Sequence, residues 1–507
     1  MAKFRQLLSG VDMVESSGNL NVDISGIEYN SQKVQKGSIF VAIKGFNEDG
    51  AAFIKDAIQR GAAGIVLEES DEKDNKDKKT LIQDKEDSMT GAAIVKNSRK
   101  ALASLSADFF GHPSRNLDVI GITGTNGKTT IAYLMESILK LAGRKTGVIG
   151  TINYRFGGKE KPALQTTPES SDLQKMFREM VDNKIDNCIL EVSSHSLALN
   201  RVYKTHFAIG VFTNLTQDHL DFHHTREDYF KAKEKLFTEY NLKKAVVNID
   251  DPHGKMIFKK SSQEMITVGI NEEADVQAKN IKTSIDGIKF TAKTPAGEIP
   301  IISELMGRHN VYNILCAIGA AIALDISLEE IKKGIRHLKT VPGRLEKIEE
   351  GQNFTVVVDY AHTDDALKNV LTAARELTEK RLILVFGCGG NRDRDKRAKM
   401  GKAAGHFSDY SIITSDNPRD EEPASIASEI EKGIKQVVGS GQYALILDRK
   451  KAIEQAINMA EKGDIVIIAG KGHENYQLFK GRRIHFDDCE TARIFVNGKL
   501  SMINEQR

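Results

Sequence analysis

Cysteine is scarce in this chain, and the cysteines that are present form no recognisable pattern. Only four occur among 507 residues, far apart and without a CxxC pair: Cys188, Cys316, Cys388 and Cys489. A disulfide framework or a compact zinc site needs closely spaced cysteines, so neither is expected. Sparse cysteines fit reduced, buried thiols in a cytosolic protein.

The sequence also lacks an excess of charge of either sign. It carries 72 Lys and Arg against 70 Asp and Glu, a formal net charge of +2. Nucleic-acid binders usually concentrate basic residues on one face, and no basic block is present. We therefore expect no nucleic-acid partner.

Long apolar runs are missing as well. A membrane helix requires roughly 20 consecutive apolar residues, and no stretch of this chain approaches that length. Residues Met1 to Gly10 show no apolar run after their basic residues, so a secretory signal is not expected. A soluble cytoplasmic protein without membrane insertion is the prediction.

What is present is an ordinary globular composition, with 40% hydrophobic and 28% charged residues. The length suggests about three domains. In the first quarter, apolar stretches at Ser38–Lys44 and Gly64–Leu67 flank a helical pattern near Ala51–Arg60. The segment Glu68–Asp87 is dominated by Asp, Glu and Lys and predicts a solvated loop or hairpin, with a functional acidic patch as the alternative.

From Leu117 onward, apolar strands alternate with helical patterns, which indicates a parallel α/β sheet. The strand Leu117–Thr123 leads through a glycine loop into a predicted helix at Thr129–Leu141. Further predictions here are strands at Asn187–Ser193, Phe207–Thr213 and Lys244–Ile249, and a long helix at Arg308–Leu324.

The pattern restarts after Val341-Pro342-Gly343, whose composition favours a domain boundary. A second α/β domain is expected beyond it. Its predicted strands are Thr355–Asp359, Leu382–Phe386, Ser411–Thr414, Ala444–Leu447 and Asp464–Ala469.

The loop between the strand and the helix, Gly124-Thr125-Asn126-Gly127-Lys128-Thr129, predicts an ATP phosphate site. Its glycines let several backbone N–H groups face phosphate oxygens, and the helix N-terminus adds positive potential. Lys128 would reach the outer phosphates and Thr129 would bind Mg²⁺. The strict P-loop pattern places glycine where this chain has Ile122, so the loop is tighter. The alternative is a glycine turn before an ordinary helix.

Polar residues follow two other predicted strands, at the same edge of the sheet. Glu191 ends one strand and is expected to reach the phosphate site, because a buried carboxylate without a cation is costly. The alternative is a Glu that only caps a following turn. The segment Thr213–His223 contains Asp218, His219, Asp221 and His223, which together predict a second metal-facing or phosphate-facing site.

Six segments in one order are specific enough to compare with known families: Thr123–Thr130 (TGTNGKTT), Glu191–His195 (EVSSH), Thr213–Asp221 (TNLTQDHLD), Arg308–Asn313 (RHNVYN), Asp359–His362 (DYAH) and Gly470–Glu474 (GKGHE). With these segments the chain resembles the Mur ligase family, which joins amino acids to the UDP-muramyl peptide of bacterial cell-wall synthesis. The resemblance covers nearly the whole chain and is weakest in Glu68–Asp87.

The resemblance implies three domains of an α/β protein. Residues 1–112 would form a small α/β domain that binds the UDP-substrate, residues 113–341 a central P-loop ATPase with a parallel sheet, and residues 342–507 a Rossmann-like domain that receives the amino acid. The implied reaction uses ATP and Mg²⁺ to convert a substrate carboxylate to an acyl phosphate, which an amine then attacks. A cytoplasmic monomer that takes small-molecule substrates is expected.

Family roles fall on matching positions of this chain. Thr129 and Glu191 resemble ligands of one Mg²⁺, His219 lies near a second, and Lys233 matches a lysine that becomes carbamylated. The implied catalytic set is Lys128, Glu191, His219 and Lys233. Positions that match the nucleotide contacts are Gly124, Thr125, Asn126, Gly127, Lys128, Thr129, Thr130, Asn310, Asn313, Arg344 and Asp359.

The UDP-peptide contacts of the family also have counterparts: Ser31, Phe46, Asn47, Glu48, Thr166, Thr167, Ser193 and Arg201. The chain departs from the family pattern at three places. Asn30-Ser31-Gln32 replaces the usual Asp-Ser-Arg, Leu199 stands where Gln is common, and Asn391 replaces an Asp. The first two affect uridine and peptide contacts, and none affects the phosphate loop.

The segment Asp416-Asn417-Pro418-Arg419 bears on which amino acid is added. In the family this form accompanies meso-diaminopimelate, and relatives that add lysine lack the Arg. Diaminopimelate carries a second carboxylate that a guanidinium can bind through two hydrogen bonds, whereas Arg419 would repel the ammonium of lysine. The implied diaminopimelate contacts are Arg392, Asp416, Asn417, Pro418, Arg419, Gly470 and Glu474.

Several alternatives stay open at this point. Asp416–Arg419 is also consistent with a simple turn, because Asn-Pro favours turns. The same ligation with L-lysine and a ligase like folylpolyglutamate synthetase are the nearest alternatives in function. A P-loop kinase or GTPase would need a strict Walker loop, and a non-catalytic scaffold would not need Lys128, His219 and Lys233 together.

Overall fold

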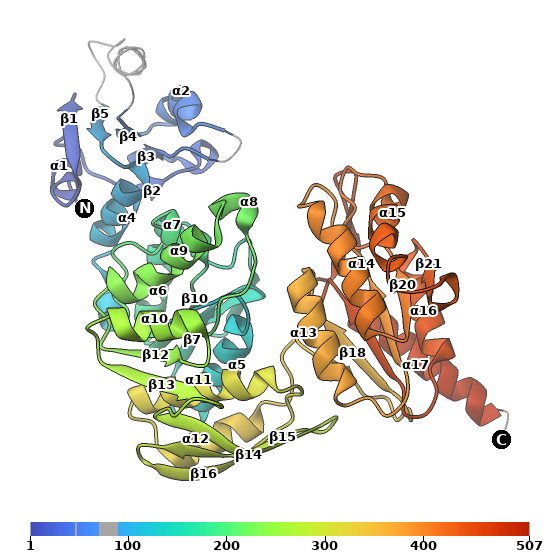
Figure 1. Cartoon of the computed structure of the whole chain (residues 1–507). Coiled ribbons are helices and arrows are strands. Elements are labelled where there is room, and N and C mark those ends of the chain that lie inside the picture. Colours follow the sequence, from blue (N-terminus) through green and yellow to red (C-terminus); the bar gives the residue numbers. More distant parts are fainter. Residues whose placement is uncertain (1, 46–47, 70–89, 506–507) are drawn as a thin grey trace.

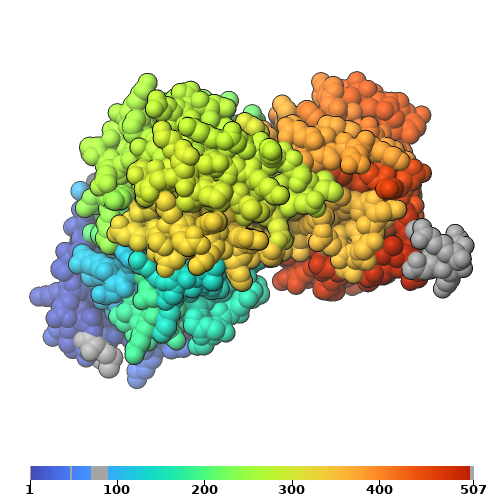
Figure 2. Space-filling model, turned by 90° about the horizontal axis from the view of Figure 1, so that it is seen from below, coloured from blue at the N-terminus to red at the C-terminus, as the bar shows by residue number. Residues whose placement is uncertain are grey.

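Three large sheets organise the part of the chain that the computed structural model describes, residues 2–45, 48–69 and 90–505 (Figure 1). The N-terminal sheet lies at one end of the central body, and the C-terminal sheet forms a lobe to its side. Viewed from below, the orange-to-red lobe stands beside the yellow segment of the central body (Figure 2). The predicted α/β class with three parts is confirmed.

The N-terminal sheet has the strand order β1-β5-β4-β3-β2 and is parallel except at its edge strand β1. Its middle strands are buried on both faces, as their continuous apolar sequences predicted. Residues 70–87 of the predicted solvated segment lie outside the described residues. The elements are α1 (Phe4–Leu8), β1 (Met13–Ser17), β2 (Gly26–Glu28), η1 (Ser31–Lys33), β3 (Ser38–Ala42), η2 (Gly50–Phe53), α2 (Ile54–Gln59), β4 (Gly64–Glu68), β5 (Gly91–Val95) and α4 (Ser98–Phe109).

The central sheet has the order β16-β15-β14-β13-β12-β11-β6-β10-β7-β8-β9. Its strands are β6 (Asp118–Thr123), β7 (Thr146–Ile149), β8 (Asn153–Phe156), β9 (Lys159–Pro162), β10 (Asn187–Glu191), β11 (Ile209–Phe212), β12 (Lys244–Asn248), β13 (Met265–Gly269), β14 (Val276–Ser284), β15 (Gly287–Thr294) and β16 (Gly297–Ser303). Its helical elements are η3 (Pro113–Asn116), α5 (Lys128–Leu141), α6 (Ser170–Asp182), α7 (Ser194–Ala198), α8 (Leu220–His223), α9 (Arg226–Thr238), α10 (Pro252–Lys260), α11 (His309–Ala323) and α12 (Leu328–His337).

Helices cover both faces of the central sheet. On one face, apolar residues of α5, α11 and α12 pack against β6 and its neighbours in one buried cluster. On the other face, α6, α7, α9 and α10 contribute to a second cluster. Strand β6, between β10 and β11, is therefore buried on both sides, and its carboxyl end delivers the glycine loop to the middle of the sheet edge.

The central sheet differs from the prediction at its two edges. A parallel sheet was expected. The neighbouring strands in the run β13-β12-β11-β6-β10-β7 are parallel, but β8, β9, β15 and β16 run antiparallel to their neighbours. In β15 and β16 buried residues alternate with exposed ones, because one face packs on the body and the other meets solvent. Continuous apolar runs indicate only the parallel part of such a sheet.

The C-terminal sheet has the order β17-β18-β22-β19-β20-β21 and is parallel except for β17. All four cysteines of the chain are buried and free, as expected. Among the described residues, no helix is both long and apolar enough to cross a membrane. The elements of this part are β17 (Glu346–Ile348), β18 (Thr355–Asp359), α13 (Asp364–Arg375), β19 (Leu382–Phe386), α14 (Asp395–Phe407), β20 (Tyr410–Ile413), α15 (Pro423–Ile434), η4 (Ser440–Gln442), β21 (Tyr443–Leu445), α16 (Arg449–Met459), β22 (Ile465–Ala469), β23 (Tyr476–Phe479), β24 (Arg482–His485) and α17 (Asp488–Glu505).

Candidate active site

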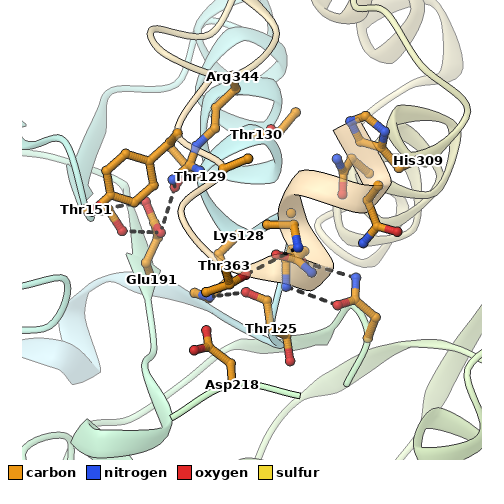
Figure 3. A pocket seen from close by; sticks show the side chains of 18 of the residues that line it. Thr125, Lys128, Thr129, Thr130, Thr151, Glu191, Asp218, His309, Arg344 and Thr363 are labelled. Atoms are coloured by element: carbon orange, nitrogen blue, oxygen red, sulfur yellow. Dashed lines mark hydrogen bonds between the residues drawn. The ribbon is translucent and has the colours of Figure 1, made fainter. Parts of the chain in front are cut away.

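A cavity of about 510 Å³ lies where the central sheet meets the C-terminal lobe (Figure 3). The phosphate loop, the end of β10, the segment after β11 and the start of α11 form its central side. The other side comes from Arg344 and from residues 359–363, at the carboxyl end of β18. In α/β sheets, ligands bind at the carboxyl ends of parallel strands, so this is the position expected of a nucleotide site.

The glycine loop has the backbone that its sequence predicts. Gly124 and Gly127 adopt φ values of 148° and 93°, and a Cβ on either residue would collide with Thr213 or Asn313. Lys128 begins α5, and its Nζ donates to the carbonyls of Gly124 and Thr125, each at 2.9 Å. Burial lowers the pKa of Lys128, while the nearby carboxylates of Glu191 and Asp218 oppose the shift. The loop is thus a preformed cradle, and the Lys128 amino group is held against its backbone carbonyls.

Glu191 reaches the same cradle from the end of β10 (Figure 3). Its side chain is buried, and it accepts hydrogen bonds from the Thr129 hydroxyl at 3.0 Å and from the Thr151 amide and hydroxyl at 3.1 and 2.9 Å. The sequence did not single out Thr151. Its position just after β7, at the carboxyl edge of a strand, was the available signal.

Lys233 lies inside the protein although it belongs to a strongly charged helix. It is 1% exposed, whereas Lys231 on the same helix is exposed. Its Nζ donates to the Gly124 carbonyl at 2.8 Å and lies 4.6 Å from the centre of the Tyr229 ring. Burial, assisted by the positive charge of Lys128, lowers the pKa of Lys233 well below its usual range. Both causes favour the neutral form of this amine over the ammonium.

The four Asp and His side chains of the segment after β11 do not gather at one point. Asp218 and His219 line the cavity, but Asp221 and His223 do not. His219 adopts a φ of 53°, and its Nε2 lies 3.4 Å from Asp218. His223 is buried and forms a hydrogen bond with Ser194 at 2.9 Å. The predicted second site is therefore reduced to Asp218 and His219.

The residues expected at the adenine end are held in place by amide hydrogen bonds. Asn310 donates to the Met306 carbonyl, and Asn313 donates to Asn310, both at 2.7 Å. Both residues line the cavity. Asp250 and Tyr312, joined by a 2.8 Å hydrogen bond, line the same end and were not predicted. The place of Asp250, shortly after β12, is again a strand end.

Arg344 and Asp359 approach the phosphate loop from the C-terminal side. Arg344 donates to the Thr129 hydroxyl at 3.4 Å and lies over the Tyr360 ring at 4.7 Å. Asp359 is buried and accepts from the amides of Leu345 and Ala361 at 2.7 and 2.8 Å. Burial raises the pKa of Asp359. Both expected nucleotide contacts of this side are therefore close to the loop.

The residues expected to contact the UDP-peptide fall into two groups. Thr166 and Ser193 line the cavity, and Thr167 bonds to the Glu191 carbonyl at 2.8 Å. Arg201 donates to the Thr167 carbonyl at 3.2 Å. Ser31, in η1, and Glu48, between β3 and η2, belong to the N-terminal part of the chain and do not line this cavity, and Phe46 and Asn47 lie outside the described residues.

The residues expected to bind the amino acid meet at the carboxyl edge of the C-terminal sheet. Asn417 donates to Glu474 at 2.8 Å, and Lys471 donates to Glu474 at 3.0 Å. Lys471 is fully buried, and the sequence had not indicated its role. Gly470 has a φ of 115°, and a Cβ there would lie 3.1 Å from Asp416. The segments after β20 and β22 thus form one side of a small polar site.

Arg419 and Arg392 supply positive charge to this polar site. Arg419 has a φ of 54°, donates from its guanidinium to the Gly390 carbonyl at 2.8 Å, and forms no ion pair within the described part of the chain. Arg392 is exposed, and its charge is among the causes that lower the pKa of Arg419, so the two guanidinium groups are neighbours. Pro418, between Asn417 and Arg419 in the sequence, is buried. Such an arrangement attracts a carboxylate.

Comparisons with known proteins agree along the whole chain. Residues 122–321 match the Mur ligase middle domain, residues 343–472 the Mur ligase glutamate ligase domain, and residues 23–110 the Mur ligase family catalytic domain. A UDP-N-acetylmuramoyl-L-alanyl-D-glutamate–2,6-diaminopimelate ligase of Alkaliphilus metalliredigens is 46% identical over 97% of this chain and 97% of its own length.

Other relatives carry the same name. The ligase of Clostridium acetobutylicum is 44% identical over 97% of this chain and 99% of its own length. A solved structure of a UDP-N-acetylmuramoyl-L-alanyl-D-glutamate–2,6-diaminopimelate ligase is 31% identical, with a TM-score of 0.68 over 98% of this chain and 99% of that one. With three matching domains and close relatives over nearly its full length, the chain belongs to the Mur ligase family.

Proposed function

We propose that this protein adds meso-2,6-diaminopimelate to UDP-N-acetylmuramoyl-L-alanyl-D-glutamate in an ATP-dependent reaction of peptidoglycan synthesis. The observation that carries the proposal is the polar site around Arg419 and Glu474. It offers a cation for the distal carboxylate of diaminopimelate and an anion for its distal ammonium. The site lies at the same sheet edge as Asp359, which lines the nucleotide cavity.

The nucleotide cavity suits ATP with Mg²⁺. Mg²⁺ prefers oxygen ligands and keeps several waters, so the Thr129 hydroxyl and the Glu191 carboxylate are suitable donors. Among the described residues, no group of three or more His, Cys, Asp or Glu side chains is arranged to hold a metal. Phosphate oxygens and water would therefore complete the shell. Bound Mg²⁺ would lower the charge repulsion between ATP and the substrate carboxylate.

Lys233 is proposed to carry a carbamate. Its neutral amine attacks the carbon of CO₂, a C–N bond forms, and a proton leaves to solvent, which gives a carboxylate-bearing side chain. The lowered pKa of Lys233 supplies the required free amine. The new anion would lie beside Gly124 of the phosphate loop and offset the positive charge of Lys128, and His219 lines the same cavity.

The reaction itself needs two displacements. An oxygen of the substrate carboxylate attacks the γ-phosphorus, the bond to ADP breaks, and an acyl phosphate results. The amine of diaminopimelate then attacks the acyl carbon, phosphate leaves, and the amine proton is lost as the amide forms. Lys128 stabilises the charge on the transferred phosphoryl group, and Arg344 approaches it from the C-terminal lobe.

The remaining residues are proposed to bind the substrates. Thr166, Thr167, Ser193 and Arg201 would hold the peptide end of the UDP-substrate, and the N-terminal sheet its uridine end. We further propose that residues 1–112, 113–341 and 342–507 are the three domains, and that the protein acts as a cytoplasmic monomer.

The proposal is tested by ATP-dependent phosphate release with UDP-N-acetylmuramoyl-L-alanyl-D-glutamate and either meso-diaminopimelate or L-lysine. Release with diaminopimelate, and little with lysine, is expected. Preference for lysine would overturn the assignment of Arg419. Release with a folate substrate, and none with the UDP-dipeptide, would overturn the proposed function altogether.

A further inference from the structure

The first turn of α6 is the place where the N-terminal sheet is joined to the central one. Helix α6 packs against α4, which belongs to the N-terminal part of the chain. Two acidic residues, Glu169 at the N-cap and Asp172 in the first turn, face that boundary. Each of them accepts a hydrogen bond from a side chain of the N-terminal part.

The two contacts are direct, one between half-buried residues and the other largely shielded from solvent. The Tyr29 hydroxyl donates to Asp172 Oδ2 at 2.7 Å. Arg99, on α4, donates from Nη1 to Glu169 at 3.2 Å, and the side chains of this ion pair are 14% and 7% exposed. Ion pairs with little exposure are screened weakly by solvent, so this one holds its partners more firmly than a surface pair does.

Both contacts lead to segments that are expected to bind uridine. Tyr29 directly precedes Asn30-Ser31. Arg99 uses its second nitrogen, Nη2, to donate to the carbonyl of Lys44 at 2.9 Å, and Lys44 lies four positions before Glu48 in the sequence. The first turn of α6 therefore fixes the starting points of both segments.

On its other side, Glu169 contacts a residue expected to bind the peptide. Arg201 Nε lies 2.8 Å from Glu169 Oε1, with 10% of its side chain exposed. Arg201 also donates to the Thr167 carbonyl, and Thr167 in turn donates to the carbonyl of Glu191. Glu169 thus contacts two guanidinium groups of the protein. That of Arg99 lies on the side expected to bind uridine, and that of Arg201 on the side expected to bind the peptide.

We propose that Glu169 and Asp172 are positioning residues that set the distance between the uridine-binding segments and the peptide-binding residues. They touch neither the reacting atoms nor, by this proposal, the substrate. A ligand that reaches from the uridine-binding segments to the peptide-binding residues needs these two groups at a fixed separation. A ligand that contacts only one of the two groups does not. The inference rests on the proposed function, because it assumes a UDP-peptide that spans the two sheets.

Two conservative variants, Tyr29→Phe and Arg99→Met, test the proposal. Calorimetry would measure the Kd of UDP-N-acetylmuramoyl-L-alanyl-D-glutamate, which spans both sides, and of UDP-N-acetylmuramate, which ends before the dipeptide. We expect each variant to weaken the first ligand about tenfold and the second less than about twofold, a coupling of ordinary size. The KM for the UDP-dipeptide should rise in parallel, with kcat and the KM for ATP unchanged.

Arg178→Met is the matched control, because Arg178 also lies on α6 but pairs with Asp182 on the surface. It should leave both Kd values unchanged. Equal weakening of both ligands by Tyr29→Phe or Arg99→Met would show a general structural role and overturn the inference, as would no weakening at all. If the unmodified protein binds and converts no UDP-dipeptide, the proposed function itself fails, which is a different result.

Discussion

Lys233 shows how much of this site depends on the environment of a single residue. An amine with a lowered pKa reacts with CO₂, whereas an ammonium does not, and burial beside Lys128 provides that condition. We predict that Lys233→Ala lowers kcat about a hundredfold or more, the usual loss when one preorganised charge is removed from an active site. Formate or acetate should restore part of the activity by replacing the missing carboxylate.

The matched control for this experiment is Lys231→Ala, because Lys231 lies on the same helix but is exposed and paired with Glu227. That variant should keep full activity, with no response to formate. Unchanged activity of Lys233→Ala would contradict the carbamate proposal, and so would a loss that no carboxylate restores at any concentration.

Arg419 is the residue on which, in the proposed function, the choice of amino acid depends. Its guanidinium is bound only to a backbone carbonyl among the described partners, so its charge is available to a ligand. We predict that Arg419→Ala lowers kcat/KM for meso-diaminopimelate about a hundredfold, because a charge-assisted pair of hydrogen bonds is lost. The kcat/KM for L-lysine should stay the same or rise, since an ammonium is no longer repelled.

Measuring kcat/KM for both amino acids in the Arg419→Ala variant distinguishes a change in substrate specificity from a general loss of structure at the site. An equal loss with the two substrates would indicate a disturbed loop, which is a real alternative because Arg419 has a positive φ. Arg493→Ala, on α17, is a suitable control, since Arg493 is a half-exposed arginine that pairs with Glu350. It should change neither value.

Single residues could be predicted where a sequence pattern fixes their surroundings. The phosphate loop is one such case, because its strand, glycines and helix are adjacent in sequence. Thr151 and Lys471 were not predicted in this way. Thr151 meets Glu191 because the ends of two strands lie side by side, and Lys471 meets Glu474 because the loop between them turns back. Both contacts depend on the folded sheet and its loops.

At the scale of elements, α14 and α15 are joined by a buried arginine that also supports the amino-acid site. Arg397 is fully buried and donates to Glu421 and Glu429, each at 2.9 Å. Its hydrogen bond, followed by one from the Asn391 amide, lowers the pKa of Glu421 to about 2. Glu421 follows Arg419 closely in sequence, so the pair ties that loop to α14.

This pair predicts a specific dependence of stability on pH. A carboxyl group whose pKa is lowered by folding stabilises the protein fully above its unfolded value of 4.5, and the effect is lost as pH falls toward about 2. Glu421→Gln should therefore lower the urea midpoint of the C-terminal lobe at about pH 6 and have much less effect at about pH 2.5. The same decrease at both pH values would mean that the charge of Glu421 does not contribute.

Whole elements were predictable to the extent that burial on both faces left continuous apolar runs. Strands β6, β10, β18 and β19 were found within a residue or two at each end for this reason. The strands β14 to β16, which pair antiparallel with one another, were not found, because their alternating polar residues resemble surface loops. Helix α12 packs on β16, although α11 lies between the two in the chain.

On the scale of the whole molecule, the three sheets share two boundaries. The N-terminal sheet meets the central one along α4 and α6, and the C-terminal lobe meets it around the nucleotide cavity. The second boundary holds few direct bonds among the described residues, such as that of Arg344 with Thr129. A nucleotide in the cavity would contact both sides and add to those bonds.

A nucleotide should therefore couple the unfolding of the central and C-terminal parts. An ATP analogue with Mg²⁺ at about 100 times its Kd stabilises whatever part binds it by about 2.7 kcal/mol. Because Arg344 and Asp359 belong to the C-terminal side of the cavity, calorimetric transitions of both parts should move to higher temperature together. In Arg344→Met the central transition should still rise, but the C-terminal one should rise less. In Lys128→Ala, adding the nucleotide should leave both transition temperatures at their nucleotide-free values, since the phosphate contact is lost. A C-terminal transition that ignores nucleotide in the unmodified protein would mean that the cavity binds ATP from the central side alone.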